Sequence, residues 1–287
     1  MTTSQQLRGH AEQFFYSSLV RTVRLRNLIP GRRAMTPSFL LVGAQRSGTT
    51  SLFKYLTRHP DYRAPIRKEI HYFSLHYSRG PEWYKAHFPG VDDAPSFTGD
   101  ATPYYLYHPL AAQRAHELLP DAKIVVLLRD PVSRARSHYQ HEVAKGHERL
   151  SFRDAIDAEP ERLRGEVERI TNSPDATSFA HQHYSYMARG RYLDQLLVWE
   201  EAFGADNVLT LTSESMFADP AAAVNTVTEF LDVASFDLHD AKAYNSYEKA
   251  KAADSFLDEL AERFAEDNQR LYDHLGRDLG WRKPAGT

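Results

Sequence analysis

The stretch with the most evident chemistry is a turn, Gly43–Thr50, that joins an apolar run to a hydroxyl-rich helix start. Gly43 and Gly48 have the spacing of the nucleotide-phosphate loop G-x-x-x-x-G-K-[ST]. The first N–H groups of a helix have no partner inside the helix, and the positive end of the helix dipole favours an anion. The sequence therefore predicts a phosphate-binding loop, with glycines that serve turn geometry alone as the alternative.

The loop lacks the lysine that contacts the β- and γ-phosphates in nucleotide triphosphate sites. Thr49 stands at that position, and the cation of the loop is Arg46, three residues earlier. We expect such a loop to suit an anionic ligand without a triphosphate tail.

A second anion pocket is predicted where the most apolar run of the chain, Lys123–Leu128, ends in Arg129. Asp130 and Pro131 supply an N-cap and a first-turn proline for a helix through Ala144. Ligands of open parallel sheets bind at the carboxyl ends of the strands. An ordinary helix cap with solvated charges is the alternative. Four polar residues recur at helical spacing and share one face of this helix: Asp130, Arg134, Ser137 and His141.

Ionisable side chains next to aromatic ones mark a third candidate, the segment Arg67–Phe73. Lys68, Glu69 and His71 fall within four residues of one another, and such crowding shifts pKa values. The segment is a candidate for acid–base chemistry, and a surface cluster of ion pairs is the alternative.

These candidates need strands and helices that alternate along the chain. Buried strands are predicted at 39–42, 123–128 and 207–212, each followed by a helix. This order predicts an α/β fold, a P-loop-type doubly wound parallel sheet flanked by helices in a single domain. Residues 158–184 look like a loop that could cover the site, and one helix is expected to run from Leu257 to Leu275.

Composition narrows the class of protein. The net charge of −3 argues against a nucleic-acid partner, and the lack of cysteine excludes a disulfide framework and thiolate zinc sites. No apolar run reaches the ~20 residues that span a bilayer, so a cytoplasmic location is expected. Residues 1–35 form a basic amphipathic extension, whose segment 8–33 either contacts an anionic membrane surface or packs on the domain. No pattern in the sequence indicates an oligomeric state.

Several motifs occur together and in order between Ser38 and Trp281. They are Val42–Leu52 with His59-Pro60, Lys68–Phe73, Trp83-Tyr84, Leu128–Pro131 with Ser137, and Gly276–Trp281. Together they resemble sulfotransferases that use 3′-phosphoadenosine 5′-phosphosulfate (PAPS), in particular the heparan sulfate and carbohydrate branch and its bacterial relatives. The resemblance places the sulfotransferase domain at 36–284.

The resemblance implies which residues bind the donor and which act on it. Glu69 is implied as the general base, with His71 as the second choice and Lys68 assisting. Arg46 is implied to stabilise charge on the oxygen that bridges sulfur and the leaving nucleotide, 3′-phosphoadenosine 5′-phosphate (PAP). The 5′-phosphosulfate is implied to bind Arg46, Ser47, Gly48, Thr49, Thr50 and Ser51, the 3′-phosphate Arg129 and Ser137, and the rest of the nucleotide Tyr247, Lys249 and Lys251.

The implied reaction is direct in-line transfer of a sulfuryl group to a hydroxyl of a saccharide, glycolipid or small metabolite, with no metal required. Trp83, Tyr84, Tyr104 and Tyr105 could stack on a sugar ring or belong to the core. The animal carbohydrate enzymes have E-K-[ST]-P where this chain has Asp100–Pro103, and the loss of that lysine disfavours a heparan-like polyanion as the acceptor.

Three other functions compete with this interpretation. A P-loop small-molecule or nucleotide kinase fits the glycines of the first loop, but it would have Lys in place of Thr49 and a metal-binding Asp in place of Arg129. A non-catalytic nucleotide- or glycan-binding module is the second alternative, and it would not need Glu69. A metal site is the third, but the sequence indicates no third ligand that would converge on the histidines, and solvated helix histidines are the more common case. Its candidate residues are His138, His141 and His147, or His181 and His183.

Overall fold

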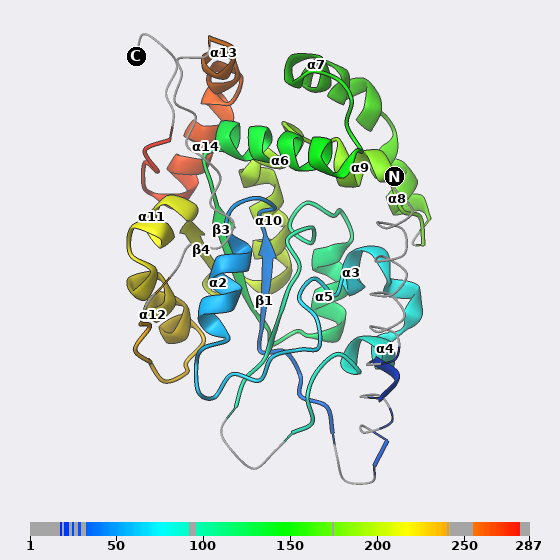
Figure 1. The fold of residues 1–287 in the computed structure, drawn as a ribbon, viewed down its shortest axis with the longest axis vertical. Helices are drawn as coiled ribbons and strands as arrows, with labels where there is room; N and C mark the ends of the chain where they lie inside the picture. Colours follow the sequence, from blue (N-terminus) through cyan, green and yellow to red (C-terminus); the bar gives the residue numbers. More distant parts are fainter. Residues whose placement is uncertain are drawn as a thin grey trace.

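The centre of the molecule is a four-stranded sheet in the order β2-β1-β3-β4, with every strand parallel to its neighbours (Figure 1). The computed structural model describes residues 33–91, 96–173, 175–239, 241 and 255–281, with 18, 20–22, 25, 28 and 29 nearer the N-terminus. Tyr247, Lys249 and Lys251 lie outside the described residues, as does most of 8–33. The strands are β1 (Phe39–Gly43), β2 (Gly99–Ala101), β3 (Lys123–Leu128) and β4 (Val208–Thr212).

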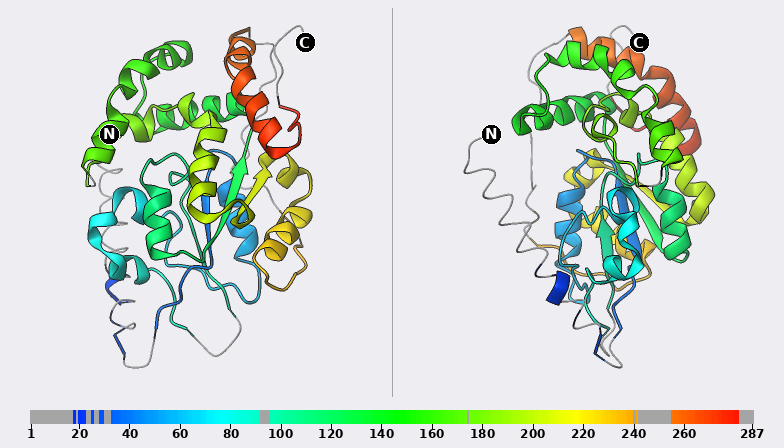
Figure 2. Two further views of the ribbon diagram at one scale, coloured as in Figure 1. Left: turned by 180° about the vertical axis from the view of Figure 1, so that it is seen from behind. Right: turned by 90° about the vertical axis from the view of Figure 1, so that its right-hand side faces the viewer.

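Helices cover both faces of the sheet, as the edge-on view in Figure 2 shows. Leu40 and Val42 of β1 pack on one side, and Phe39 and Leu41 pack on the other. This alternation explains why β1 and β3 read as continuous apolar runs. The first side is covered by α3 (Tyr72–Leu75), α4 (Pro81–Lys85), α5 (Ala111–Leu118), α10 (Tyr192–Phe203) and α14 (Ala265–Leu275), and the second by α2 (Thr49–Leu56), α11 (Ser213–Ala218) and α12 (Pro220–Phe230).

A group of helices lies beyond the carboxyl ends of the strands, at the top of Figure 1. Helix α6 crosses there, and Val132 and Ala135 on it pack in a separate apolar cluster with α7 and α13. The group consists of α6 (Pro131–Lys145), α7 (Phe152–Leu163), α8 (Glu166–Asn172), α9 (Phe179–His183) and α13 (Ser255–Arg263).

The parallel sheet with helices on both faces confirms the predicted fold class. The predicted start of α6 is also confirmed, because Asp130 Oδ1 accepts a hydrogen bond of 2.7 Å from the backbone N–H of Ser133, ahead of Pro131. Asp219 caps α12 in the same way through the N–H of Ala222. Within the described residues, no helix is both long enough and apolar enough to cross a bilayer.

Two predictions about secondary structure were wrong. Residues 158–184 are mostly helical, although Pro160 lies inside α7. Tertiary packing outweighs the polar composition, since Ile156, Ile170 and His181 on these helices are buried. The expected helix from 257 to 275 is two helices that meet at Phe264, whose side chain is buried against Gly190.

Candidate active site

A cleft of about 980 Å³ opens at the carboxyl ends of β1 and β3. The loop after β1, the Glu69 segment and the start of α6 all contribute to its walls. The sequence-predicted residues that line it are Arg46, Gly48, Thr49, Thr50, Glu69, His71, Arg129 and Ser137. The three candidate segments, far apart in the sequence, therefore form one site.

The loop between β1 and α2 has the shape of an anion cradle. Gly48 has a φ of 92°, which favours glycine, and a Cβ there would lie 3.0 Å from side-chain carbons of Met216 and Phe217. No side chain in the described part of the chain caps α2, and Thr49 and Thr50 at its start line the cleft. The positive end of this helix thus faces the cleft.

The two predicted anion pockets are in direct contact. Arg46 Nε donates a hydrogen bond of 3.1 Å to Ser137 Oγ, across from the loop to α6. Arg129 Nη1 donates one of 3.1 Å to the backbone carbonyl of Arg46. Burial and the positive charges of Lys145 and Arg46 lower the pKa of the His141 imidazole to about 4. The electrostatic environment of the cleft is therefore positive next to His141. Such a pocket fits a ligand with two separate anionic groups.

Glu69 is one of three carboxylates that line the cleft, with Glu142 and Glu214. Lys68 Nζ donates to Glu69 Oε1 at 2.7 Å, and His71 Nε2 lies 3.7 Å from Glu69 Oε2. The Glu69 side chain is 43% exposed. Desolvation opposes its ionisation, but His71 and Lys68 outweigh it and hold the pKa of the carboxyl well below the ordinary 4.5. Glu69 is therefore ionised at neutral pH, with Oε2 turned away from Lys68.

Backbone strain is concentrated in the same place. Arg46, Glu69 and His71 have φ values of 73°, 63° and 58°, and Asp232 is the fourth non-glycine residue with positive φ in the described ranges. Such conformations cost on the order of 1–3 kcal/mol each and tend to occur at functional sites. Three of these four residues are those that the sequence singled out for chemistry.

Some predicted residues do not face the cleft. Arg134 is fully buried and donates to the carbonyl of Tyr186, so it does not belong to the predicted polar face with Ser137 and His141. Ser47 and Ser51 are also fully buried and do not line the cleft. Ser47 Oγ has no hydrogen-bond partner among the described residues.

The aromatic residues divide between core and cleft. Tyr84 and Tyr105 are buried, and their hydroxyls donate to Asp100 Oδ2 at 3.4 and 2.8 Å. Asp100 is buried as well and also accepts from Thr102 Oγ1 at 2.7 Å. Tyr104 lines the cleft, so it is the member of this set that could meet an acceptor.

Sequence reasoning missed a contact between the first loop and the far wall of the cleft. Arg189 Nη1 donates to Gln45 Oε1 at 2.5 Å, and its Nη2 donates to the carbonyls of His181 and Gln182. With Gln45 Oε1 held in this way, the amide nitrogen of Gln45 remains to donate elsewhere. No sequence pattern links residues 45 and 189. The other missed residues of the wall include Glu142, Lys145 and Gln182.

Comparison with known proteins places this geometry in a family. Residues 36–276 match the family model described as sulfotransferase domain. A sulfotransferase of Alicyclobacillus acidocaldarius is 33% identical to the chain, with a TM-score of 0.70 over 85% of this chain and 98% of that one.

Two curated relatives are more distant. The chain is 28% identical over 282 residues to human heparan sulfate glucosamine 3-O-sulfotransferase 6, covering 88% of this chain and 75% of the relative. It is 25% identical over 320 residues to the membrane-associated sulfotransferase kil1 of Dictyostelium discoideum, with coverage of 88% and 68%.

Transfer of a sulfuryl group is thus better supported than the phosphoryl transfer of a kinase, the alternative that the first loop left open. The match extends over the loop, the Glu69 segment and α6, which together form the cleft. The chain is a transferase and belongs to the sulfotransferase family.

Proposed function

We propose that this sulfotransferase moves a sulfuryl group from PAPS to a hydroxyl of a saccharide or a related small acceptor. The observation that carries the proposal is the contact between the two anion pockets, with Arg46 joined to both Ser137 and Arg129. A donor with a phosphosulfate at one end and a 3′-phosphate at the other needs two such pockets. We assign the catalytic domain to residues 36–284.

Two features of the loop fit a bound anion. Gly48 lines the cleft, and a Cβ there would meet Met216 and Phe217, so no side chain covers the backbone of the turn. The start of α2 also lines the cleft and has no side-chain cap among the described residues. The N–H groups at the start of α2, with Arg46, are the groups that would hold the 5′-phosphosulfate. Arg129 and Ser137 would hold the 3′-phosphate.

Glu69 is the proposed general base. Its ionised carboxylate would accept the proton of the acceptor hydroxyl as that oxygen attacks sulfur. His71 and Lys68 hold the pKa of Glu69 low, and Arg46 would stabilise the charge that develops on the bridging oxygen as PAP leaves. His71, whose Nε2 lies 3.7 Å from Glu69 Oε2, is the second candidate for the base.

The class of acceptor is inferred from the relatives and from the wall of the cleft. The human relative is named for a glucosamine hydroxyl of heparan sulfate. Gln182 and Tyr104 line the wall of the cleft in this chain. Tyr104 is only 4% exposed and its hydroxyl lies 2.8 Å from His181 Nδ1, so Gln182 is the more accessible group for a sugar hydroxyl. A cytoplasmic location and membrane contact through residues 8–33 remain parts of this proposal.

Titration calorimetry with PAP, AMP and ATP with magnesium tests the donor site without knowledge of the acceptor. We expect PAP to bind with a dissociation constant in the micromolar range or below and AMP to bind much more weakly, because AMP lacks the 3′-phosphate. A preference for ATP with magnesium would contradict the proposal and support a kinase instead.

A further inference from the structure

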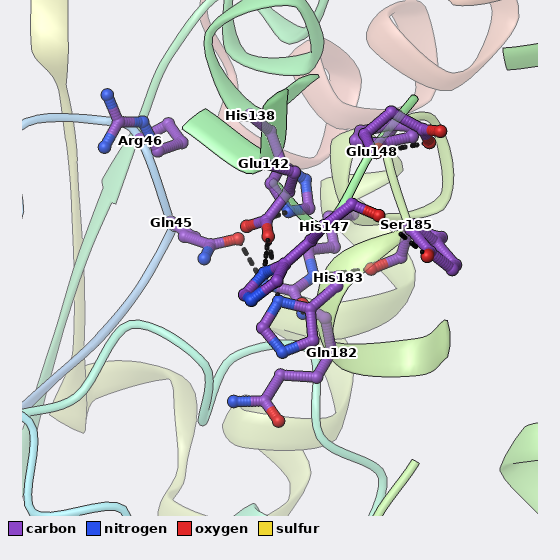
Figure 3. Close-up of polar contacts among 12 residues, drawn as sticks. Gln45, Arg46, His138, Glu142, His147, Glu148, Gln182, His183 and Ser185 are labelled. Carbon is purple, nitrogen blue, oxygen red and sulfur yellow. Dashed lines mark hydrogen bonds and ion pairs between the residues drawn. The ribbon is translucent and has the colours of Figure 1, made fainter. Parts of the chain in front are cut away.

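Two histidines and a glutamate from separate segments meet beside the cleft. Glu142 lies in the last turn of α6, His147 follows that helix, and His183 is the last residue of α9. Glu142 Oε2 lies 2.7 Å from His147 Nδ1 and 2.9 Å from His183 Nδ1. Figure 3 shows both imidazole rings directed at this carboxylate.

The charge of Glu142 is balanced differently from that of its buried neighbour Glu148. Arg162 donates two hydrogen bonds to Glu148, and Tyr186 adds a third. The Glu142 side chain is only 1% exposed, yet its ion-pair partners in the described part of the chain are all histidines. A buried carboxylate surrounded by imidazoles has the ligands of a divalent cation but lacks a lysine or arginine partner.

A third histidine provides an independent observation. His138, one helical turn before Glu142, is fully buried, and neither ring nitrogen has a hydrogen-bond partner among the described residues. Its Nε2 lies 3.5 Å from Glu142 Oε1, the oxygen that faces away from His147 and His183. Metal-bound carboxylates are commonly oriented by an outer hydrogen-bond partner, and a small shift of the His138 ring would bring Nε2 into that range.

We propose that Glu142, His147 and His183 bind a divalent transition-metal ion, with zinc as the best match. The three donor atoms lie within 4.8 Å of one another. Donors around tetrahedral zinc are roughly 3.3 Å apart for metal–ligand bonds of about 2.0–2.1 Å, a separation between the two Glu142 contacts of 2.7 and 2.9 Å and the 4.8 Å that bounds all three pairs, so side-chain shifts of about 0.5–1.5 Å would admit the ion. His138 would orient the carboxylate from outside the coordination shell.

The proposed metal site borders the cleft of the candidate active site. Glu142 and His183 both line the cleft that holds Arg46 and Glu69. Three protein ligands leave one position of a tetrahedral ion for water or another oxygen. A metal ion held here would therefore contact the cleft from the α6 side, on the wall formed by Gln182 and His183 rather than at the phosphate loop.

Titration of the chelator-treated full-length protein with Co²⁺, followed by Zn²⁺ competition, tests the proposal. We expect one ion per chain and the visible absorption of tetrahedral Co²⁺. The double variant His147→Ala/His183→Ala should bind on the order of 100-fold more weakly or worse, since loss of an outer-shell partner alone costs 10–100-fold. The control is His274→Ala, because His274 pairs with Glu200 at 2.9 Å in the described part of the chain without a third ligand.

The result that would overturn the proposal is wild-type binding weaker than about 10 µM, or binding of equal strength in the double variant. Circular dichroism establishes whether that variant folds. If it does not, the single variant His183→Gln takes its place, with a loss of at least about tenfold expected and an unchanged affinity counting against the site. Calorimetry with PAP on the metal-free protein separates a failure here from a failure of the donor site.

Discussion

Replacement of Arg129 by alanine should weaken the binding of PAP more than the binding of a nucleotide that lacks the 3′-phosphate. Arg129 lies where the 3′-phosphate is proposed to bind, and hydrogen bonds to a charged group contribute about 1.5–3 kcal/mol. Its Nη1 also holds the carbonyl of Arg46, a neutral contact of about 0.5–1.5 kcal/mol that supports the first loop for any ligand. The variant therefore loses a contact specific to the 3′-phosphate and a smaller one shared by all nucleotides.

Loss of the 3′-phosphate contact should make PAP bind Arg129→Ala roughly 10- to 150-fold more weakly than the wild type. Loss of the contact to the Arg46 carbonyl should weaken binding by a further factor of up to about ten. Adenosine 5′-phosphosulfate, which has no 3′-phosphate, should lose only the shared part. Titration calorimetry of both nucleotides measures the difference directly. The matched control is Arg153→Ala, an exposed arginine on α7 that pairs with Glu259 away from the cleft.

Equal losses for PAP and adenosine 5′-phosphosulfate would refute the assignment. Arg129 would then act only by supporting the loop, and the 3′-phosphate would have to bind elsewhere. Ser137→Ala removes a hydroxyl assigned to the 3′-phosphate together with its contact to Arg46 Nε, without removing a charge, so it should also weaken PAP more than adenosine 5′-phosphosulfate.

Three further predictions concern catalysis and stability. Glu69→Gln should lower turnover about 100-fold or more in a sulfate-transfer assay while PAP affinity stays the same, and turnover within a few-fold of wild type would exclude Glu69 as the base. Lys68→Ala should raise the pKa of Glu69 toward 4.5, so the acid side of the kcat/KM profile moves to higher pH; an unmoved profile would count against Lys68 as the cause. Tyr105→Phe should lower the free energy of unfolding by about 1–3 kcal/mol in a urea titration, because buried Asp100 loses a donor. Tyr77→Phe, which removes only an exposed hydroxyl bond to Glu117, should change it by about 0.5 kcal/mol or less.

Local patterns were sufficient for much of the fold and for many of the residues that line the cleft. The run Lys123–Leu128 is apolar because both faces of β3 are covered, and Asp130-Pro131 starts a helix through a hydrogen bond within three residues. Such signals depend on neighbours in the chain. The Gly43–Thr50 loop was recognisable for the same reason.

Contacts between distant segments could not be predicted. Gln45 and Arg189 are 144 residues apart, and only the folded chain brings them together. Glu142 meets His183 across 41 residues, so the third ligand that the histidines lacked in the sequence came from α6. The polar composition of residues 158–184 led to the wrong prediction of a loop. The helices there are stabilised by a few buried side chains such as Ile170.

The left-handed backbone at Arg46, Glu69 and His71 implies a conflict between the stability of the protein and its activity. Glycine adopts this conformation without the penalty of about 1–3 kcal/mol that other residues incur, and its own entropic cost is about 0.5–1 kcal/mol. Replacing one of these residues by glycine should therefore leave the protein as stable or slightly more stable, but without a side chain that is proposed to act in catalysis. Under that proposal, selection for thermal stability alone would favour variants of low activity at these three positions, and engineering of more stable forms should leave them unchanged.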